Sequence, residues 1–401
     1  MSPNQILVAN IGSTSFKFRL FEMPSERVLA RGAVERIGCE EGLYSFQIGD
    51  EPMRKSQGHF PDYDAAIALV EEKLGGFSHL AAVGFKPVMA RDVSGTQLLD
   101  EPVLRAMEEI NTLLPAHNPP YVAAVRSFHR THPGLPCIGT FETAFYDDVP
   151  ERNVRFPVPI EWREKYGVRR HGFHGASHRY VTQRCAELRG TDRLRLISCH
   201  LGGSSSIAAV LNGKAINSSW GMTPQSGLPQ NNRVGDFDVF ALIYLARDLG
   251  LGIDAVEKAL TSHSGLKGMS GLATGDMRDL VDASEKGNAH AHAALEVFVG
   301  AIRKYIGQFL VELNGADAII FTAGIAENHP QLRAEVCANL DFCGLELDAE
   351  ANERARCSEA VISSPRSKIE VRVIPTNEEL IIARNAWQKL STLETATHTH
   401  H

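Results

Sequence analysis

The sequence predicts an α/β protein made of two related domains with mixed sheets, and three observations lead to this fold class. The chain has 401 residues, which is more than one hydrophobic core usually supports. Apolar strand-like segments alternate with segments of helical periodicity. One strand–turn–strand pattern occurs near the start of the chain and again in its middle. Two domains imply a cleft between them, where ligands usually bind.

The repeated pattern is a β-hairpin whose turn contains glycine and small hydroxyl residues. Its first copy, Leu7–Leu20, reads as a strand, a Gly/Ser turn and a second strand of alternating polarity. The second copy, Ile197–Val210, has the same order and leads to a further turn at Asn212–Lys214. We therefore expect each domain to contain a sheet whose first hairpin exposes backbone N–H groups.

The other expected elements follow from apolar periodicity and turn residues. Between the hairpins, Tyr63–Leu74 and Val103–Leu114 have helical spacing, and His79–Val88 reads as a strand. Later elements are helices at Asp236–Leu249, Ile253–Leu260 and Asn288–Leu313, strands at Ala316–Gly324 and Val371–Pro375, and a helix after Asn377 through Trp387. The glycine that ends the strand at 324 predicts a close backbone approach.

Composition and charge exclude several classes of protein. Apolar residues make up 43% and charged residues 22% of the chain, as is ordinary for a globular protein. A net charge of −7 argues against nucleic acid or a membrane surface as partner, and no apolar run reaches the roughly 20 residues of a membrane helix. Seven cysteines without a CxxC pair fit reduced thiols better than disulfides or zinc. We expect a cytoplasmic protein.

The first hairpin turn, Asn10–Lys17, has the residues that a phosphate-binding loop needs. It offers a glycine for a tight turn, small hydroxyl residues, exposed N–H donors and a lysine. It lacks the GxxxxGK[ST] spacing, which excludes a P-loop. Taken alone, such a turn is more often an ordinary hairpin with a solvated lysine. The second turn, His200–Ser206, favours the functional interpretation, because two such turns could hold the phosphates of one nucleotide.

Further polar strings lie in apolar surroundings, at Pro115–Pro120, Phe141–Phe145, Arg169–His178, Asn231–Asp236, Gly275–Asp279, Gly324–Asn328 and Pro375–Leu380. With the first turn they resemble, in order and over nearly the whole chain, the acetate kinase family of short-chain carboxylate kinases. The resemblance implies a duplicated ribonuclease-H-like fold, shared with sugar kinases, Hsp70 and actin. It also implies a homodimer in which ATP and a small carboxylate, or ADP and an acyl phosphate, meet in the interdomain cleft.

On this resemblance, residues 1–148 with 377–393 form an N-terminal domain on the carboxylate and phosphate side. Residues 149–376 form a C-terminal domain on the nucleotide side. We expect residues 394–401 to be a disordered tail.

The resemblance also implies roles for individual residues. Asn10 and Glu378 match the groups that place Mg²⁺. The residues that match contacts to phosphate and nucleotide are Ser13, Ser15, Lys17, His200, Gly202, Gly203, Asp276, Met277, Arg278, Gly324, Ile325 and Asn328. The residues that match the catalytic groups are His117, His174 and Arg233, with Lys86 and Glu142. A transferring phosphoryl group spreads negative charge over its oxygens, so fixed imidazole and guanidinium donors suit it.

Several of these residues also have a structural explanation. A single histidine such as His117 or His174 is more often a satisfied polar group than a catalyst. Arg233 could form a surface ion pair, and Asp276–Arg278 could simply begin a helix with an acidic cap. The two histidines lie in predicted loops, where function concentrates, and this favours the catalytic interpretation.

Three departures from the family's motifs fall on the acid and phosphoryl side. Lys86 stands where the family has an arginine, and lysine keeps the charge but loses the bidentate fork. Arg91 could compensate only through a bend, because residues five apart along a strand point to opposite faces. Glu142 replaces an aspartate, and Gly203 replaces an asparagine of the second turn.

A fourth departure is in the acyl pocket, where Ala116 replaces a leucine. The other walls of that pocket match Val88, Phe173 and Pro224, so a larger acid such as propionate should fit. The preferred hypothesis is an ATP-dependent kinase with an altered acid preference. One alternative is a nucleotide-binding paralogue with lost or altered chemistry, closer to an Hsp70 or actin switch. Another is the use of pyrophosphate, which the open turn at 324–326 disfavours.

Overall fold

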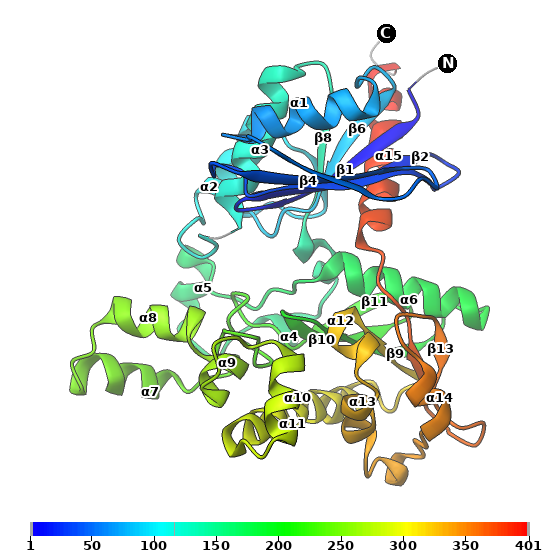
Figure 1. The fold of residues 1–401 in the computed structure, drawn as a ribbon. Coiled ribbons are helices and arrows are strands. Elements are labelled where there is room, and N and C mark those ends of the chain that lie inside the picture. The colour runs from blue at the N-terminus through cyan, green and yellow to red at the C-terminus, as the bar shows by residue number, and fades with distance from the viewer. Residues whose placement is uncertain (1–2, 116, 399–401) are drawn as a thin grey trace. The chain divides into compact units, whose positions relative to one another are not determined.

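The computed structural model describes residues 3–115 and 117–398. The chain divides into two compact units. Unit 1 consists of Met1–Asp147 and Asn377–His401, and unit 2 of Asp148–Thr376. Unit 1 is therefore discontinuous in sequence, because its last helix follows the whole of unit 2. Each unit is built on one mixed sheet (Figure 1).

The sheet of unit 1 has eight strands in the order β5-β4-β3-β2-β1-β6-β8-β7. The strands are β1 (Gln5–Gly12), β2 (Ser15–Glu22), β3 (Arg27–Glu35), β4 (Gly42–Ile48), β5 (Arg54–Gly58), β6 (Leu80–Phe85), β7 (Thr96–Leu98) and β8 (Cys137–Thr140). The helices are α1 (Tyr63–Leu74), α2 (Glu101–Glu108), α3 (Asn118–Thr131), the 3₁₀ helix η1 (Glu142–Tyr146) and α15 (Glu378–His398). β1 to β5 form an antiparallel meander, whereas β1, β6 and β8 run parallel.

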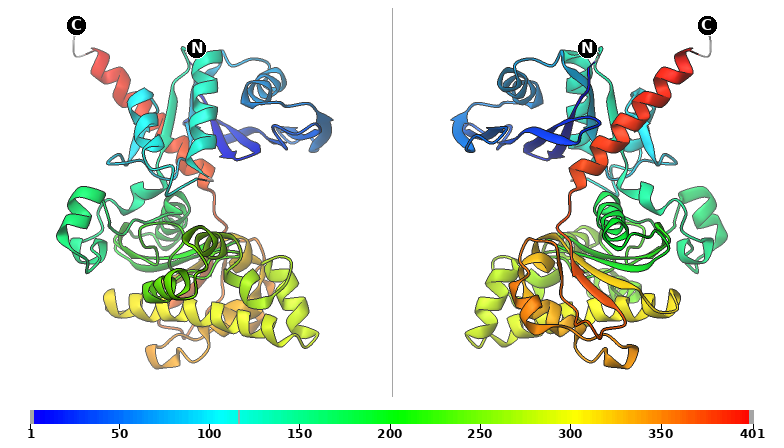
Figure 2. Two further views of the ribbon diagram at one scale, coloured as in Figure 1. Left: turned by 90° about the vertical axis from the view of Figure 1, so that its left-hand side faces the viewer. Right: turned by 90° about the vertical axis from the view of Figure 1, so that its right-hand side faces the viewer.

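Helices pack against this sheet, with α3 and α15 both in contact with β1 and β8 (Figure 2). Side chains of β1 alternate between its two faces, as a strand requires. Leu7 and Ala9 join a buried core with Phe128 of α3. Gly84 of β6 lies against α15, where a Cβ would approach Ile382 Cγ2 to 3.0 Å. Absence of a side chain at this glycine therefore lets α15 pack closely on the sheet.

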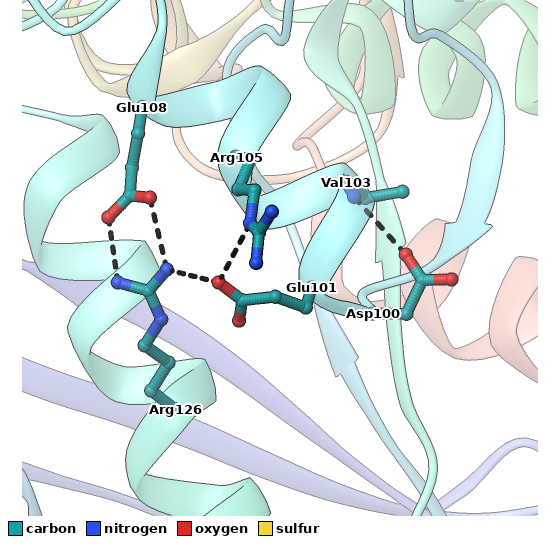
Figure 3. A network of polar contacts seen from close by, with 6 residues as sticks. All are labelled: Asp100, Glu101, Val103, Arg105, Glu108 and Arg126. Atoms are coloured by element: carbon teal, nitrogen blue, oxygen red, sulfur yellow. Dashed lines mark hydrogen bonds and ion pairs between the residues drawn. The ribbon is translucent and has the colours of Figure 1, made fainter.

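An ion-pair network fixes α3 against α2 (Figure 3). Asp100 caps α2 by accepting a hydrogen bond from the Val103 N–H at 3.1 Å. From α3, Arg126 donates to both carboxylate oxygens of Glu108 at 2.7 and 3.0 Å, and to Glu101 at 2.8 Å. A bidentate arginine has a defined geometry, which ordinary surface pairs lack. The network thus sets the position of α3, whose first turn follows a candidate site residue.

The sheet of unit 2 has six strands in the order β11-β10-β9-β12-β14-β13. The strands are β9 (Arg195–Leu201), β10 (Ser205–Leu211), β11 (Lys214–Ser218), β12 (Ala318–Thr322), β13 (Ala360–Val361) and β14 (Glu370–Val373). The first helices are α4 (Glu151–Val154), α5 (Ile160–Tyr166), α6 (Gly175–Arg189), α7 (Val239–Ile243), the π-helical η2 (Tyr244–Asp248), α8 (Ile253–Ser262) and α9 (Gly265–Ser270). The others are α10 (Met277–Glu285), α11 (Ala289–Glu312), α12 (Ala323–Asn328), α13 (Pro330–Cys337), η3 (Asp341–Cys343) and α14 (Ala349–Arg354).

The core of unit 2 lies between its sheet and α11. Phe298, Ile302 and Phe309 of this helix are buried with Ile197 and Ile207 of β9 and β10. α6 contacts β9 and β12 from the side of the sheet opposite α11 (Figure 1). Burying both faces of the sheet explains why its central strands β9, β10 and β12 are buried over most of their length.

Five strands of each sheet share one order and one set of directions. The order is β3-β2-β1-β6-β8 in unit 1 and β11-β10-β9-β12-β14 in unit 2. In unit 1, β1 to β3 form an antiparallel meander, and β6 and β8 extend it as parallel strands beside β1. In unit 2, β9 to β11 form the meander, and β12 and β14 extend it as parallel strands beside β9. This arrangement is the duplicated ribonuclease-H-like fold. The predicted α/β fold class with mixed sheets is confirmed.

Some elements have different ends from those that the sequence predicts. The helix expected at Val103–Leu114 begins at Glu101, because Asp100 caps it, and ends at Glu108. The helix expected from Asp236 begins only after Asp238, whose side chain accepts a hydrogen bond from the N–H two residues later. In both cases a capping carboxylate, rather than apolar periodicity, sets the first turn.

The C-terminal end of unit 1 is the helix α15. α15 continues to His398, because no glycine or proline interrupts the sequence after Glu378. Residues 399–401 lie outside the described part of the chain. Within residues 3–115 and 117–398, no helix combines the length and the apolar character that crossing a membrane requires.

Candidate active site

The β1–β2 hairpin groups the residues of unit 1 that are predicted to contact metal and phosphate. Asn10 lies opposite Lys17 in the ladder, and Gly12 lies opposite Ser15. A Cβ on Gly12 would come to 2.6 Å from Ser15 Oγ, so a larger residue there would displace this hydroxyl. Ser13 and Lys17 are exposed, and both can therefore reach a ligand at the turn.

Three further predicted residues of unit 1 form a buried charge cluster. Lys86 follows β6, Glu142 opens η1 and Glu378 opens α15. Lys86 Nζ lies 2.8 Å from Glu142 Oε1 and 2.5 Å from Glu378 Oε2. Burial alone would lower the pKa of Lys86, but the two carboxylates outweigh it and hold the pKa well above its usual range. Arg91 does not join this cluster and instead lies 3.5 Å from Glu109.

The oxygen atoms near this cluster suit Mg²⁺, which prefers carboxylate and amide oxygens. Tyr121 lies between the β1–β2 hairpin and this charge cluster. Its hydroxyl is 3.5 Å from Asn10 Oδ1, and the charges of Lys86, Glu142 and Glu378 act on its pKa. Burial is the main cause that raises the pKa of Tyr121 to about 12, so the phenol stays protonated. Among the described residues no three His, Cys, Asp or Glu side chains are placed to hold a metal ion. The set fits Mg²⁺ that completes its shell with water and substrate phosphates.

His117 is held at the N-terminus of α3 by the residue that follows it. His117 itself is exposed, whereas Asn118 is fully buried. Asn118 Nδ2 donates to the carbonyl oxygens of Met89 at 3.1 Å and Met107 at 2.8 Å. These bonds fix the backbone on which His117 stands. Ala116, which is predicted to widen the acyl pocket, lies outside the described residues.

In unit 2 the predicted residues His174 and His200 stack on each other, with ring centroids 4.1 Å apart. His174 has a left-handed φ of 57° directly before α6, and its Nδ1 lies 2.9 Å from Ser206 Oγ. His200 is the sixth residue of β9, and its Nδ1 lies 2.7 Å from Ser177 Oγ. Trp220 meets the His174 ring edge-on at 5.3 Å. Serine hydroxyls and aromatic contacts thus orient both imidazoles.

Arg233 is half-buried and is bound by neutral groups. Its Nη1 donates to the carbonyl oxygen of Pro224 at 2.8 Å, and its Nη2 donates to Ser204 Oγ at 2.6 Å in the second turn. Within the described residues no carboxylate forms an ion pair with it, so a surface ion pair does not explain this arginine. Burial lowers the pKa of Arg233, and the neutral groups that bind it leave its charge uncompensated. An anionic ligand would compensate it.

The predicted walls of the acyl pocket are divided between the two units. Phe173 is buried in unit 2, where its ring meets that of Trp220 edge-on at 5.5 Å. Pro224, also in unit 2, is fixed through its carbonyl group by Arg233. Val88 lies in unit 1 and is half-buried. All three are apolar side chains, as the wall of a pocket for a small acyl group requires.

A pocket of about 620 Å³ opens in unit 2. It is lined by Gly202, Gly203, Asn231, Asp276, Met277, Arg278, Gly324, Ile325, Asn328, His329 and Arg356. The structure thus brings together every residue of unit 2 that is predicted to contact the nucleotide, except His200. The size is in the range of small-molecule sites. The sequence does not point to two of these residues, His329 and Arg356, and Asn231 belongs to a recognised string without being given a role of its own.

Glycines and capping side chains shape this pocket. A Cβ on Gly275 would come to 1.9 Å from the Asn231 carbonyl oxygen, so the two segments can approach only with glycine there. A Cβ on Gly203 would come to 3.2 Å from Asn231 Nδ2, and a side-chain amide therefore lies beside this turn after all. Asp276 caps α10, and its hydrogen bond from the Arg278 guanidinium is the main cause that lowers its pKa to about 2.

The segment at 324–326 is the first turn of α12 rather than an open turn. The helix begins directly after β12 because the Glu327 carboxylate accepts a hydrogen bond from the Ala323 N–H at 2.7 Å. Ala323 adopts a left-handed φ of 69° to make this sharp change of direction. A Cβ on Gly324 would meet no atom within 4 Å, so this position borders open space in the pocket.

Comparison with known proteins gives the family of the chain. The sequence model of the acetokinase family matches residues 5–384. The chain belongs to the acetokinase family. An acetate kinase of Geobacillus kaustophilus is 42% identical over 390 residues, covering 95% of this chain and 98% of that protein. The crystal structure of Porphyromonas gingivalis acetate kinase has a TM-score of 0.88 and 35% identity, over 95% of this chain and 98% of the other.

A second solved structure that resembles this acetokinase-family protein is a kinase of a different acid. A propionate kinase of Francisella tularensis has a TM-score of 0.88 and 30% identity, over 96% of this chain and 99% of that one. The predicted family is therefore confirmed. Membership makes the protein a phosphotransferase with a carboxyl group as acceptor.

Proposed function

We propose that the protein reversibly transfers the γ-phosphoryl group of ATP to a short-chain carboxylate, which yields an acyl phosphate and ADP. Membership of the acetokinase family supports this reaction. The structural observation that carries the proposal is Arg233, a half-buried guanidinium that no carboxylate neutralises among the described residues. Such a cation gains most from an anionic ligand, and a phosphoryl group in transfer is one.

The pocket of unit 2 is proposed to bind ATP and ADP. Gly202 and Gly203 let phosphate oxygens approach the backbone of the β9–β10 turn, as in other anion-binding turns. Gly324 leaves room for the nucleoside beside Ile325, and Asp276 offers a carboxylate for ribose or base. In unit 1, Ser13, Ser15 and Lys17 are proposed to contact phosphate, a function that the exposed turn and its amine suit.

The proposed reaction requires hydrogen-bond donors to the phosphoryl group rather than a general base. A carboxylate substrate is ionised at neutral pH, so it attacks phosphorus without giving up a proton. His117, His174 and Arg233 are therefore proposed to stabilise the charge on the equatorial oxygens rather than to remove a proton. Lys86 is proposed to attract the carboxylate of the acid, and it also forms an ion pair with Glu142 at 2.8 Å.

Magnesium is proposed to bind at Asn10 and Glu378, with Glu142 close by. When bound, Mg²⁺ would neutralise phosphate charge and orient the β- and γ-phosphates. Lys86 favours the ionised form of Glu378, because it lies 2.5 Å from that carboxylate. The same contact means that the metal has to share Glu378 with an ammonium group.

We propose an acid larger than acetate, such as propionate, as the preferred substrate. The family contains a propionate kinase, from Francisella tularensis. Val88, Phe173 and Pro224 are apolar, and on the resemblance residue 116 is the remaining wall of the acyl pocket. Alanine at 116 has a much smaller side chain than leucine and should leave room for a further methylene group.

We also propose a cytoplasmic homodimer. The segment from α7 to α8 carries a group of large exposed apolar side chains, namely Phe237, Val239, Phe240, Tyr244, Leu249, Leu251 and Ile253. Phe240 is 73% exposed, which is unusual for a phenylalanine unless another surface covers it. A second copy of the chain is the proposed partner, as the resemblance implies. The free state of all seven cysteines suits a reducing compartment that supplies ATP.

One assay tests the proposed reaction. The purified protein is incubated with MgATP and a panel of C2 to C6 acids, and hydroxylamine traps any acyl phosphate as a hydroxamate. The proposal predicts trapped product, with propionate turned over more efficiently than acetate. Nucleotide binding without product for every acid would instead support the paralogue with altered chemistry. A parallel reaction with pyrophosphate in place of ATP identifies the phosphoryl donor.

A further inference from the structure

The buried histidine His178 has no part in the proposed reaction, yet hydroxyl groups connect it to His174. Its exposed fraction is 0%. Its Nδ1 lies 2.8 Å from Ser198 Oγ, and its Nε2 lies 2.8 Å from Ser206 Oγ. Ser206 Oγ is also the atom that lies 2.9 Å from His174 Nδ1. A continuous chain of hydrogen bonds therefore runs from Ser198 through His178 and Ser206 to His174.

Secondary structure places these four residues together. His174 directly precedes α6 and has a left-handed φ of 57°, and His178 is the fourth residue of that helix. Ser198 is on β9 and Ser206 is on β10, two strands that pair with each other, and α6 contacts β9. Three of the four positions thus belong to a helix or a strand of unit 2, and the fourth, His174, adjoins the same helix.

The number of protons limits how this chain can be arranged. The Ser206 hydroxyl has one proton and two imidazole neighbours, so it donates to one ring and accepts from the other. In the first arrangement Ser206 donates to His174 Nδ1 and accepts from the His178 Nε2–H. In the second arrangement every donor and acceptor in the chain is reversed, and His174 then carries its proton on Nδ1.

Ser198 decides between the two arrangements. Its side chain is 0% exposed, and among the described residues its hydroxyl has a hydrogen bond with His178 alone. In the second arrangement Ser198 would accept from His178 Nδ1–H, and its own buried proton would have no acceptor. A buried hydroxyl proton without an acceptor costs free energy, because in water it would be hydrogen-bonded. Ser198 therefore donates to His178 Nδ1, and the first arrangement follows for the whole chain.

We infer that the relay Ser198–His178–Ser206 fixes His174 as the neutral tautomer with its proton on Nε2, and that His178 is a positioning residue of the phosphoryl site. The inference rests on the function proposed for His174. A carboxylate nucleophile has no proton to remove, so His174 is not needed as a base. An imidazole that keeps its Nε2 proton can donate a hydrogen bond to the phosphoryl oxygens. Burial also holds the pKa of His178 well below its usual range, which keeps the middle of the relay uncharged.

The neighbouring imidazole follows the same rule. Ser177 is 0% exposed, and the contact between its hydroxyl and His200 Nδ1 at 2.7 Å is its one side-chain hydrogen bond among the described residues. Ser177 therefore donates, and His200 also carries its proton on Nε2. A Cβ on Gly202 would lie 3.8 Å from that nitrogen, so it faces the second turn. Two stacked neutral rings also avoid the repulsion of two imidazolium charges.

The tautomer can be measured in the full chain without substrate. Protein labelled with ¹⁵N in histidine is studied at neutral pH by long-range ¹H–¹⁵N correlation, and a His174→Gln variant assigns the His174 signals. The expected result is an unprotonated Nδ1 and a protonated Nε2. An Nδ1-protonated ring, an imidazolium, or two tautomers in exchange would overturn the inference. This measurement does not depend on kinase activity, so it separates failure of the relay from failure of the proposed function.

Variants then test whether the relay acts at a distance. Ser198→Ala removes the proton that sets the direction of the hydrogen bonds from residue 198 to His174, so His174 should become a mixture of tautomers. The kcat should fall by at least about twofold, with unchanged KM for ATP and acid. Ser206→Ala removes the hydroxyl at His174 itself and should lower kcat by about tenfold. Ser363→Ala is the matched control, because this buried hydroxyl accepts only from the Val371 N–H among the described residues. A Ser198→Ala protein with one tautomer and wild-type kcat would refute the relay.

Discussion

Replacing Lys86 with methionine should destabilise unit 1. The change keeps most of the side-chain volume and removes the ammonium that lies 2.8 Å from Glu142 and 2.5 Å from Glu378. Loss of one partner of a buried ion pair costs about 3–5 kcal/mol. Because the side chains of Lys86 and Glu378 remain 18% and 17% exposed, the lower end of about 3 kcal/mol applies. At about 2–4 °C per kcal/mol, the melting temperature should fall by about 6–12 °C.

The pH dependence of this loss has a defined sign. In the wild type, burial tends to lower the pKa of Lys86, but Glu142 and Glu378 raise it above the value in the unfolded chain. Its stabilisation is therefore complete below the unfolded pKa and disappears only as the pH rises through the higher folded pKa. In K86M the two carboxylates lose their counter-ion, and we expect their pKa values to rise above the unfolded values. The deficit should then be small at acidic pH and largest at mildly alkaline pH.

Thermal unfolding of both proteins at acidic, neutral and mildly alkaline pH measures this difference. K86R is the matched control, because it keeps the positive charge and should unfold within about 1 kcal/mol of the wild type. E142Q removes one of the two carboxylates and should reduce the penalty when it is combined with K86M. A K86M protein that melts like the wild type at alkaline pH, or whose deficit does not change with pH, would refute the reasoning.

Three further predictions concern unit 2. Arg233→Met should lower kcat by about 10³ with little change in ATP affinity by calorimetry, because the guanidinium is proposed to act on the phosphoryl group; a loss confined to ATP affinity would contradict this. Gly324→Leu should weaken ATP binding without lowering the melting temperature, since a Cβ there meets no atom within 4 Å. Gly307→Leu on α11, equally open and outside the pocket, is its control, and equal ATP affinity in both would exclude the proposed nucleoside position. Phe240→Glu should convert a dimer into a monomer in light scattering, and a wild-type monomer would remove the proposed interface.

Local signals in the sequence predict much of the fold. The two hairpins were recognisable because a glycine turn between alternating strands is a short-range pattern, and Gly12 and Gly202 occupy such turns. α1 has the predicted bounds, Tyr63–Leu74, because Asp62 caps it and Gly75 ends it. Predictions were wrong where a side chain competes with periodicity, as at the caps Asp100 and Asp238.

The site was less accessible to sequence reasoning, since its contacts join distant parts of the chain. The pair of Lys86 and Glu378 spans 292 positions, and no local pattern announces it. Arg356 lines the pocket because its segment folds back onto α12, where it donates to the Asn328 carbonyl oxygen at 2.8 Å. His178 was visible in a recognised string, but its importance appears only with the two serines of the sheet.

The discontinuity of unit 1 has a consequence for synthesis of the protein. The ribosome releases the β1–β2 hairpin and Lys86 early, but Glu378 leaves it only after the whole of unit 2. Until then Gly84 and its neighbours on β6 lack the helix that covers them, and Lys86 lacks one of its carboxylates. Unit 2 can fold first, since its sheet is continuous in sequence. A nascent chain can therefore form the pocket of unit 2, which is proposed to bind the nucleotide, before it contains the proposed metal ligand Glu378.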